Sequence, residues 1–93
     1  MQDNTIIAKT FKALCDETRV SIIKFLGSQE KCACHISEEL NIAQSKLSYH
    51  MKILCDSGLI ECRFSGKWTY YQISKIGSKN AIDLLKELTS KGV

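Results

Sequence analysis

Several features that mark other classes of protein are missing from these 93 residues. The chain contains no proline and no serine-rich linker, and 44% of its residues are hydrophobic, so a disordered segment is not expected. No apolar run approaches the roughly 20 residues needed to span a bilayer, and the N-terminus lacks a signal-peptide pattern. We therefore expect one cytoplasmic domain over residues 1–93, with no membrane partner.

The motifs of common enzymes are missing as well. The chain has no phosphate-binding glycine loop and no recognisable acid–base pair. Its Cys-x-Cys sequence differs from the Cys-x-x-Cys of thiol oxidoreductases, and no βαβ pattern surrounds it. These absences argue against an enzyme and favour a binding protein.

What the chain does have is a mild excess of positive charge and five cysteines. The net charge is +3 and the pI is near 8.6, which permits nucleic-acid binding without proving it. Five is a high and odd number of cysteines for the cytosol, where disulfides are disfavoured. Metal, metalloid or redox chemistry is one explanation. The plainer explanation is that some of the cysteines are small buried side chains.

Residues 32–56 are predicted to form two helices joined by a tight turn. In the second helix, at about residues 44–55, Leu47, Met51 and Leu54 share one narrow arc at about 100° per residue. The opposite arc carries small hydroxyls, a phenol and a lysine. A helix that enters the major groove of DNA presents such a face, so this helix is predicted to read DNA.

A β-hairpin is predicted to follow, with strands at 59–64 and 68–73 and a turn at 65–67. Positive charges at its tip would meet phosphates beside the reading helix, as the wing of a winged helix-turn-helix does. The predicted fold class is therefore mainly α with a β-hairpin wing. The predicted DNA contacts are Gln44, Ser45, Lys46, Ser48, Tyr49, Lys52, Arg63 and Lys67.

Amphipathic helices are predicted at both ends of the chain, at about 4–14 and 79–89, with a nearly apolar helix at 17–26 between the first of them and the reading unit. The apolar arc of the first helix is wide enough to need two packing partners. A terminal amphipathic helix on so small a domain often closes a dimer, so a homodimer is expected.

Two residues near the reading unit are expected to have structural roles. His50 lies beside the apolar arc of helix 44–55, so it is predicted to be a partly buried histidine rather than a base contact. Cys62, on the first strand of the hairpin, is predicted to be packed.

Four stretches of the chain stand out together: FKALCDETRVSIIKFL, CACHISEEL, QSKLSYHMKILCDSGLI and RFSGKWTYYQI. In this order they resemble the ArsR/SmtB family of winged-helix metal-responsive repressors. Members of this family are homodimers that pair through their first and last helices and repress transcription until an inducer binds. The resemblance therefore implies double-stranded operator DNA and a second subunit as partners.

The resemblance also draws attention to Glu30-x-Cys32-x-Cys34. It is similar to the Glu-Leu-Cys-Val-Cys-Asp motif of members that sense arsenic, antimony, cadmium or lead. Ser37 stands where the best-known arsenite sensors have a third cysteine, and the extra N-terminal cysteines of cadmium sensors have no counterpart. The site implied by the resemblance is thus incomplete and needs another donor.

Thiolates select soft ions, and trivalent arsenic takes three of them in a pyramid. Side chains two residues apart point about 200° apart on a helix but to one side of extended backbone, so an ion shared by Cys32 and Cys34 demands non-helical or distorted backbone. A small thiol or water is the alternative to a further cysteine. The candidate metal ligands are Cys32, Cys34, Cys15 and Cys55.

No cofactor is required for DNA binding in this hypothesis. As(III) or Sb(III) is the favoured inducer, with Cd(II), Pb(II) or Zn(II) as alternatives. A second hypothesis keeps the DNA-binding fold and makes the cysteines a thiol-redox or sulfur-species switch. With that switch, oxidation would release the protein from DNA and reduction would restore DNA binding, independently of metal.

Overall fold

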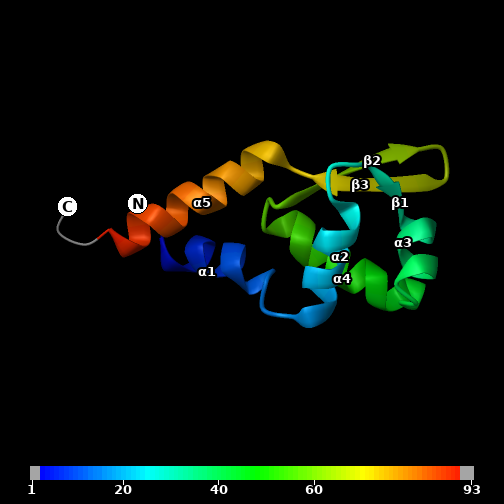
Figure 1. Cartoon of the computed structure of the whole chain (residues 1–93), viewed down its shortest axis with the longest axis horizontal. Helices are drawn as coiled ribbons and strands as arrows, with labels where there is room; N and C mark the ends of the chain where they lie inside the picture. Colours follow the sequence, from blue (N-terminus) through cyan, green and yellow to red (C-terminus); the bar gives the residue numbers. More distant parts are fainter. Residues whose placement is uncertain (1–2, 91–93) are drawn as a thin grey trace.

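The computed structural model describes residues 3–90, and its helices and strands follow one another along an elongated molecule (Figure 1). The elements are α1 (Asn4–Lys12), α2 (Glu17–Leu26), β1 (Lys31–Cys32), α3 (Ala33–Glu39), α4 (Gln44–Asp56), β2 (Ile60–Ser65), β3 (Trp68–Ile73) and α5 (Lys75–Thr89). Helices α1 and α5 project at one end, and α3 and the hairpin lie toward the other (Figure 1). The predicted fold class, mainly α with a β-hairpin wing, is confirmed.

Side-chain caps determine where two of the helices begin. The Asp16 carboxylate accepts a hydrogen bond from the backbone N–H of Arg19, which starts α2 where the sequence predicted. The Ser74 hydroxyl accepts from the N–H of Gly77, so α5 begins at Lys75 rather than near residue 79. A Cβ at Gly77 would overlap the carbonyl group of Gly58, so this close approach requires glycine.

The wing is a three-stranded antiparallel sheet with the order β1-β3-β2, where the sequence had predicted only a two-stranded hairpin. The additional strand β1 pairs Lys31 with Tyr71 and Cys32 with Tyr70. A two-residue strand is too short to show alternation in sequence, which explains why it was missed. As a consequence, the segment that carries Cys32 is hydrogen-bonded directly to strand β3 of the wing.

The hydrophobic core lies where α2, α3 and α4 meet the base of the sheet. The predicted inward arc of α4 is confirmed, because Leu47, Met51 and Leu54 are all buried. Ile22 of α2 and Ile36 of α3 are fully buried against them. This packing fixes the position of α4 relative to the sheet.

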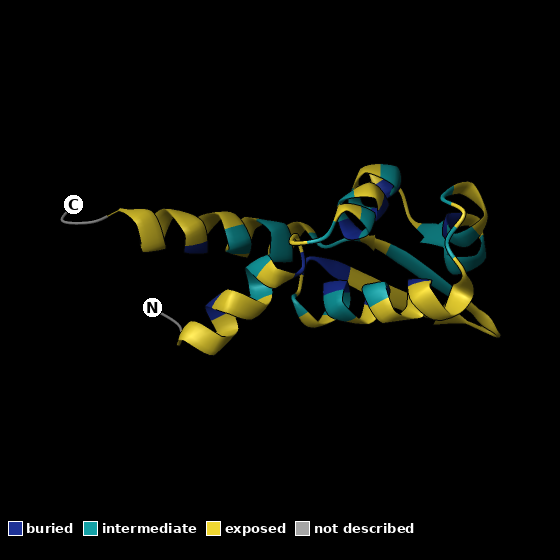
Figure 2. Ribbon diagram, turned by 90° about the horizontal axis from the view of Figure 1, so that it is seen from below, coloured by how far each residue is buried: buried dark blue, intermediate teal, exposed yellow. Residues whose placement is uncertain are grey.

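The arm formed by α1 and α5 is much less buried, and Figure 2 shows α5 exposed along most of its length. Ile7 of α1 and Leu84 of α5 are buried. By contrast, Ile6, Ile82 and Leu85 are each about half exposed, at 48%, 53% and 48%. Within residues 3–90, none of the helices combines the length and apolarity needed to cross a membrane.

Arg19 joins this arm to the reading helix. Its side chain is only 5% exposed, and its Nε donates to the carbonyl oxygen of Ala13 at 2.9 Å. A second guanidinium nitrogen donates to the Lys12 carbonyl at 3.2 Å, and the third lies 3.1 Å from Nδ1 of His50. His50 is thus partly buried and tied to its neighbours, as predicted. The role of Arg19 was not predicted.

Candidate inducer site and nucleic-acid interface

The helix-turn-helix consists of α3, the turn at 40–43, and α4. Asn41 has a positive φ of 52°, a conformation that asparagine tolerates better than most residues, and this allows the tight turn. On α4 the side chains opposite the core face are open to solvent. All eight predicted DNA contacts are exposed: Gln44, Ser45, Lys46, Ser48, Tyr49, Lys52, Arg63 and Lys67.

The two cations of the wing are in different environments. Arg63 donates two hydrogen bonds to the Glu30 carboxylate, from Nε at 3.0 Å and from the terminal nitrogen at 2.7 Å. The Arg63 guanidinium also lies 4.7 Å from the centre of the Tyr70 ring. Lys67, in the turn, has its Nζ 5.3 Å from the centre of the Trp68 ring. Arg63 is therefore already bonded within the chain. All of its N–H donors would become available to DNA only if Arg63 left Glu30.

The sulfur atoms of Cys32 and Cys34 are 3.1 Å apart. Cys32 ends β1 and also precedes the first turn of α3, with φ −70° and ψ 143°, whereas Cys34 lies within that turn. This strand-to-helix junction supplies the non-helical backbone that the sequence argument demanded. The two thiols are therefore brought together without distortion of a helix.

The two thiols differ in acidity. A hydrogen bond from the Cys34 thiol lowers the pKa of Cys32, and the backbone N–H groups of Cys34 and His35 act in the same direction. The same interaction raises the pKa of Cys34, because that thiol donates the hydrogen bond and must keep its proton to do so. Of the two thiols, Cys32 is therefore the easier to ionise, and a thiolate is the form that attacks an electrophile or binds a soft ion.

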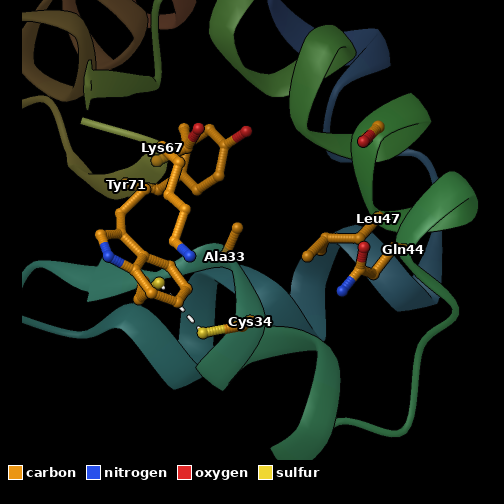
Figure 3. A pocket seen from close by; sticks show the side chains of 10 residues that line it. Ala33, Cys34, Gln44, Leu47, Lys67 and Tyr71 are labelled. Carbon is orange, nitrogen blue, oxygen red and sulfur yellow. Dashed lines mark hydrogen bonds between the residues drawn. The ribbon is translucent and has the colours of Figure 1, made fainter. Parts of the chain in front are cut away.

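A pocket of about 240 Å³ opens beside the cysteine pair, between α3, the start of α4 and the wing. Figure 3 shows Lys67 reaching from the wing toward Cys34, with Gln44 and Leu47 on the other side of the pocket. The residues that line it are Cys32, Ala33, Cys34, Gln44, Leu47, Ser48, Lys67, Trp68, Thr69 and Tyr71. The pocket thus joins the cysteine pair to residues predicted to contact DNA.

The other cysteines do not complete this site within one chain. Among residues 3–90, no group of three or more His, Cys, Asp or Glu side chains is gathered as a metal site. Cys15 is exposed in the connection between α1 and α2. Cys55 lies instead beside Cys62 of β2, and burial and that neighbour raise the pKa of Cys55 to about 11. Cys62 is exposed, so the prediction that it is packed is wrong for most of its surface.

The architecture defines the class of this protein: a winged helix-turn-helix, the fold of many DNA-binding regulators. Residues 16–61 match the family model described as bacterial regulatory protein, arsR family. An uncharacterized HTH-type transcriptional regulator of Methanocaldococcus jannaschii is 38% identical over 82 residues, which cover 87% of this chain and 92% of that protein. The chain belongs to the arsR family of transcriptional regulators.

Two further proteins give the range of the similarity. The arsenical resistance operon repressor of Bacillus subtilis is 45% identical over 65 residues, and the match covers 69% of this chain and 62% of that protein. The structure of HlyU from Vibrio cholerae superposes with a TM-score of 0.73 at 30% identity, covering 98% of this chain and all of that one. The Bacillus subtilis and Methanocaldococcus jannaschii proteins are named for arsenical resistance and for transcriptional regulation, respectively.

Proposed function

We propose that this protein is a transcriptional repressor that binds operator DNA and is released by trivalent arsenic or antimony held at Cys32 and Cys34. The observation that carries the proposal is the 3.1 Å separation of the two sulfurs at one edge of the helix-turn-helix. The similarity to an arsenical resistance repressor supports the same class of inducer.

The number of ligands favours arsenic over zinc. The two neighbouring sulfurs supply two ligands. A structural zinc site needs four ligands, whereas trivalent arsenic needs three. Cadmium and lead remain alternatives, because both are also soft ions that thiolates bind.

Operator binding is proposed to use the exposed face of α4 and the tip of the wing. A helix in the major groove reads base edges through side chains such as Gln44 and Ser48, while lysines contact phosphates. We further propose that the half-exposed apolar residues of α1 and α5, among them Ile82 and Leu85, pair two subunits. Two reading helices would then face two half-sites of one operator.

Release follows from the position of the cysteine pair. The pocket beside Cys34 shares Gln44, Ser48 and Lys67 with the proposed DNA surface, so an inducer bound there alters the surroundings of the groups that contact DNA. By thermodynamic linkage, operator DNA weakens binding of the inducer by the same factor. The third ligand in this proposal is Cys15 or Cys55 of a second subunit, or a ligand from solution.

The test is fluorescence anisotropy of the fully reduced protein on its own promoter DNA, under anaerobic conditions, titrated with arsenite. We expect release near one arsenite per subunit, and loss of that response in Cys32→Ser and Cys34→Ser. Cys15→Ser and Cys55→Ser are the matched variants, and a lost response in either identifies a third protein donor. DNA binding that arsenite leaves unchanged in the wild type, both without and with a small monothiol in the buffer, would refute the proposal.

A thiol-redox switch is the second candidate, because sulfurs in contact are also poised to form a disulfide. In that case the two thiols lose two electrons and two protons to an oxidant such as diamide, which is reduced to its hydrazine. Release of DNA by diamide and recovery with reductant, without any response to arsenite, would favour this switch over the arsenic sensor.

A further inference from the structure

We propose that the pocket beside Cys32 and Cys34 binds a small thiol that carries a carboxylate, and that this thiol supplies the third ligand of the arsenic. The inference rests on the proposed function and identifies the molecule that would complete the coordination of the arsenic. The inducer would then be an arsenic–thiol adduct rather than arsenite alone.

The first reason is the number of ligands. Trivalent arsenic forms three bonds, and the pair supplies two sulfurs. Among the described residues no third cysteine, histidine or carboxylate joins the pair in a metal-binding group. The remaining coordination position of a bound arsenic is therefore open to a ligand from outside the subunit.

The second reason is the space beside the pair. The pocket has a volume of about 240 Å³, which is far more than one water molecule needs. That space can take a small organic molecule. Leu47 and Trp68 provide apolar surface for a short carbon chain, and Gln44 and Ser48 provide hydrogen-bonding groups.

The third reason is charge. The cation that lines the pocket is Lys67, and no aspartate or glutamate is among the lining residues. Figure 3 shows the Lys67 side chain reaching toward the sulfur of Cys34 from the wing. Once three thiolates have neutralised the arsenic, the carboxylate is the remaining charge of the bound ligand, and it would meet this ammonium group.

The chemistry balances without an oxidant. Arsenous acid reacts with the two cysteine thiols and the small thiol, three As–O bonds are replaced by three As–S bonds, and three water molecules leave. Arsenic stays trivalent throughout. Because the small thiol would lie against Gln44 and Ser48, it would also occupy space next to the proposed reading surface.

The experiment is native mass spectrometry of the reduced full-length protein with arsenite and one of three matched thiols. These are 3-mercaptopropionate, 3-mercaptopropanol and 3-mercaptopropylamine, which share a three-carbon chain and carry a negative, a neutral and a positive terminal group. We expect one arsenic and one thiol retained per subunit, with an affinity for the carboxylate thiol about threefold above that for the alcohol and the amine weakest, since a partly exposed ion pair contributes modestly. Lys67→Met should remove the preference, and Lys24→Met, at an exposed site on α2 outside the pocket, should keep it.

Two results would overturn this inference, and a third would refute the function on which it rests. Arsenic retained with no thiol, and lost in Cys15→Ser or Cys55→Ser, would mean that the protein supplies the third donor. Thiol retained with equal affinity for all three charges would remove the role of Lys67. Retention of no arsenic under any condition would instead refute the proposed function, which makes the two failures distinguishable.

Discussion

The protein carries two pairs of neighbouring cysteines, and the surroundings of the two pairs shift the pKa of one thiol in opposite directions. Cys32 and Cys34 lie at a strand-to-helix junction, where a hydrogen bond between them lowers the pKa of Cys32. Cys55 lies at the end of α4 beside Cys62, and its burial holds the pKa near 11. The first pair is thus suited to react or bind soft ions, whereas Cys55 is kept as a neutral thiol.

The contrast shows that proximity of two sulfurs does not make a site by itself. Cys55 packs against the hydrophobic core together with Tyr71, and burial of that phenol raises the pKa of Tyr71 as well. Charged thiolates are disfavoured in such surroundings because burial penalises the ionised form. The first pair instead borders an open pocket, which gives an ion and its other ligands a way in.

The largest expected difference between the pairs is in reactivity. At pH 7.5 we expect iodoacetamide to alkylate Cys32 at least about tenfold faster than Cys55. A thiol with a pKa of about 11 holds far less thiolate than one near the usual 8.5, and its greater intrinsic nucleophilicity offsets only part of that loss. Time-resolved peptide mass spectrometry measures both rates in one sample.

Cys34→Ser provides the control for this prediction. A serine hydroxyl donates a hydrogen bond more strongly than a thiol does, so Cys32 should stay reactive in that variant. Equal rates at Cys32 and Cys55 in the wild type would contradict the assigned difference between the pairs.

The next effect concerns stability at alkaline pH. The pKa of Cys55 is higher in the folded chain than in the unfolded one, so its contribution is complete below about pH 8.5 and is lost as pH rises toward 11. Between pH 8 and pH 10.5, we expect the free energy of unfolding to fall on the order of 1 kcal/mol more in the wild type than in Cys55→Val, after allowance for solvent screening. Urea denaturation of both proteins at each pH gives this difference, and parallel losses would contradict it.

Much of the fold was predictable because its signals are periodic. The inward arc of α4 and the extent of α2 follow from the spacing of their residues. Strand β1 and the first turn of α5 were not predicted, because pairing with β3 and the close contact of Gly77 with Gly58 are tertiary interactions. The same holds for Arg19, whose burial depends on carbonyls and a histidine from other helices.

The candidate site was predictable in part. The spacing of Cys32 and Cys34 and the exposed face of α4 were visible in the sequence, and the sulfur contact is consistent with the expected pair. Sequence could not separate Cys55 from that pair, because its position beside Cys62 depends on how α4 packs on β2. It also could not show that Glu30 engages Arg63, since 33 residues separate them in the chain.

The smallest expected effect concerns the ion pair between Glu30 and Arg63, which links the segment before Cys32 to the wing. Glu30→Gln removes a carboxylate that accepts two hydrogen bonds from Arg63, so the guanidinium becomes free to reach a phosphate. We expect slightly tighter operator binding and a salt dependence steeper by about one counterion, because each phosphate contact changes the logarithmic slope by about 0.9.

Anisotropy titrations from low to moderate salt measure this slope. Arg63→Gln is the matched control and should keep the wild-type slope if Glu30 holds the guanidinium in the complex as well. A shallower slope in Arg63→Gln would mean that Arg63 leaves Glu30 when DNA binds. In that case the ion pair is exchanged for a phosphate contact, and the segment before Cys32 loses this side-chain link to β2 while β1 stays paired with β3. An unchanged slope in both Glu30→Gln and Arg63→Gln would show that Arg63 does not reach the phosphates even when it is free.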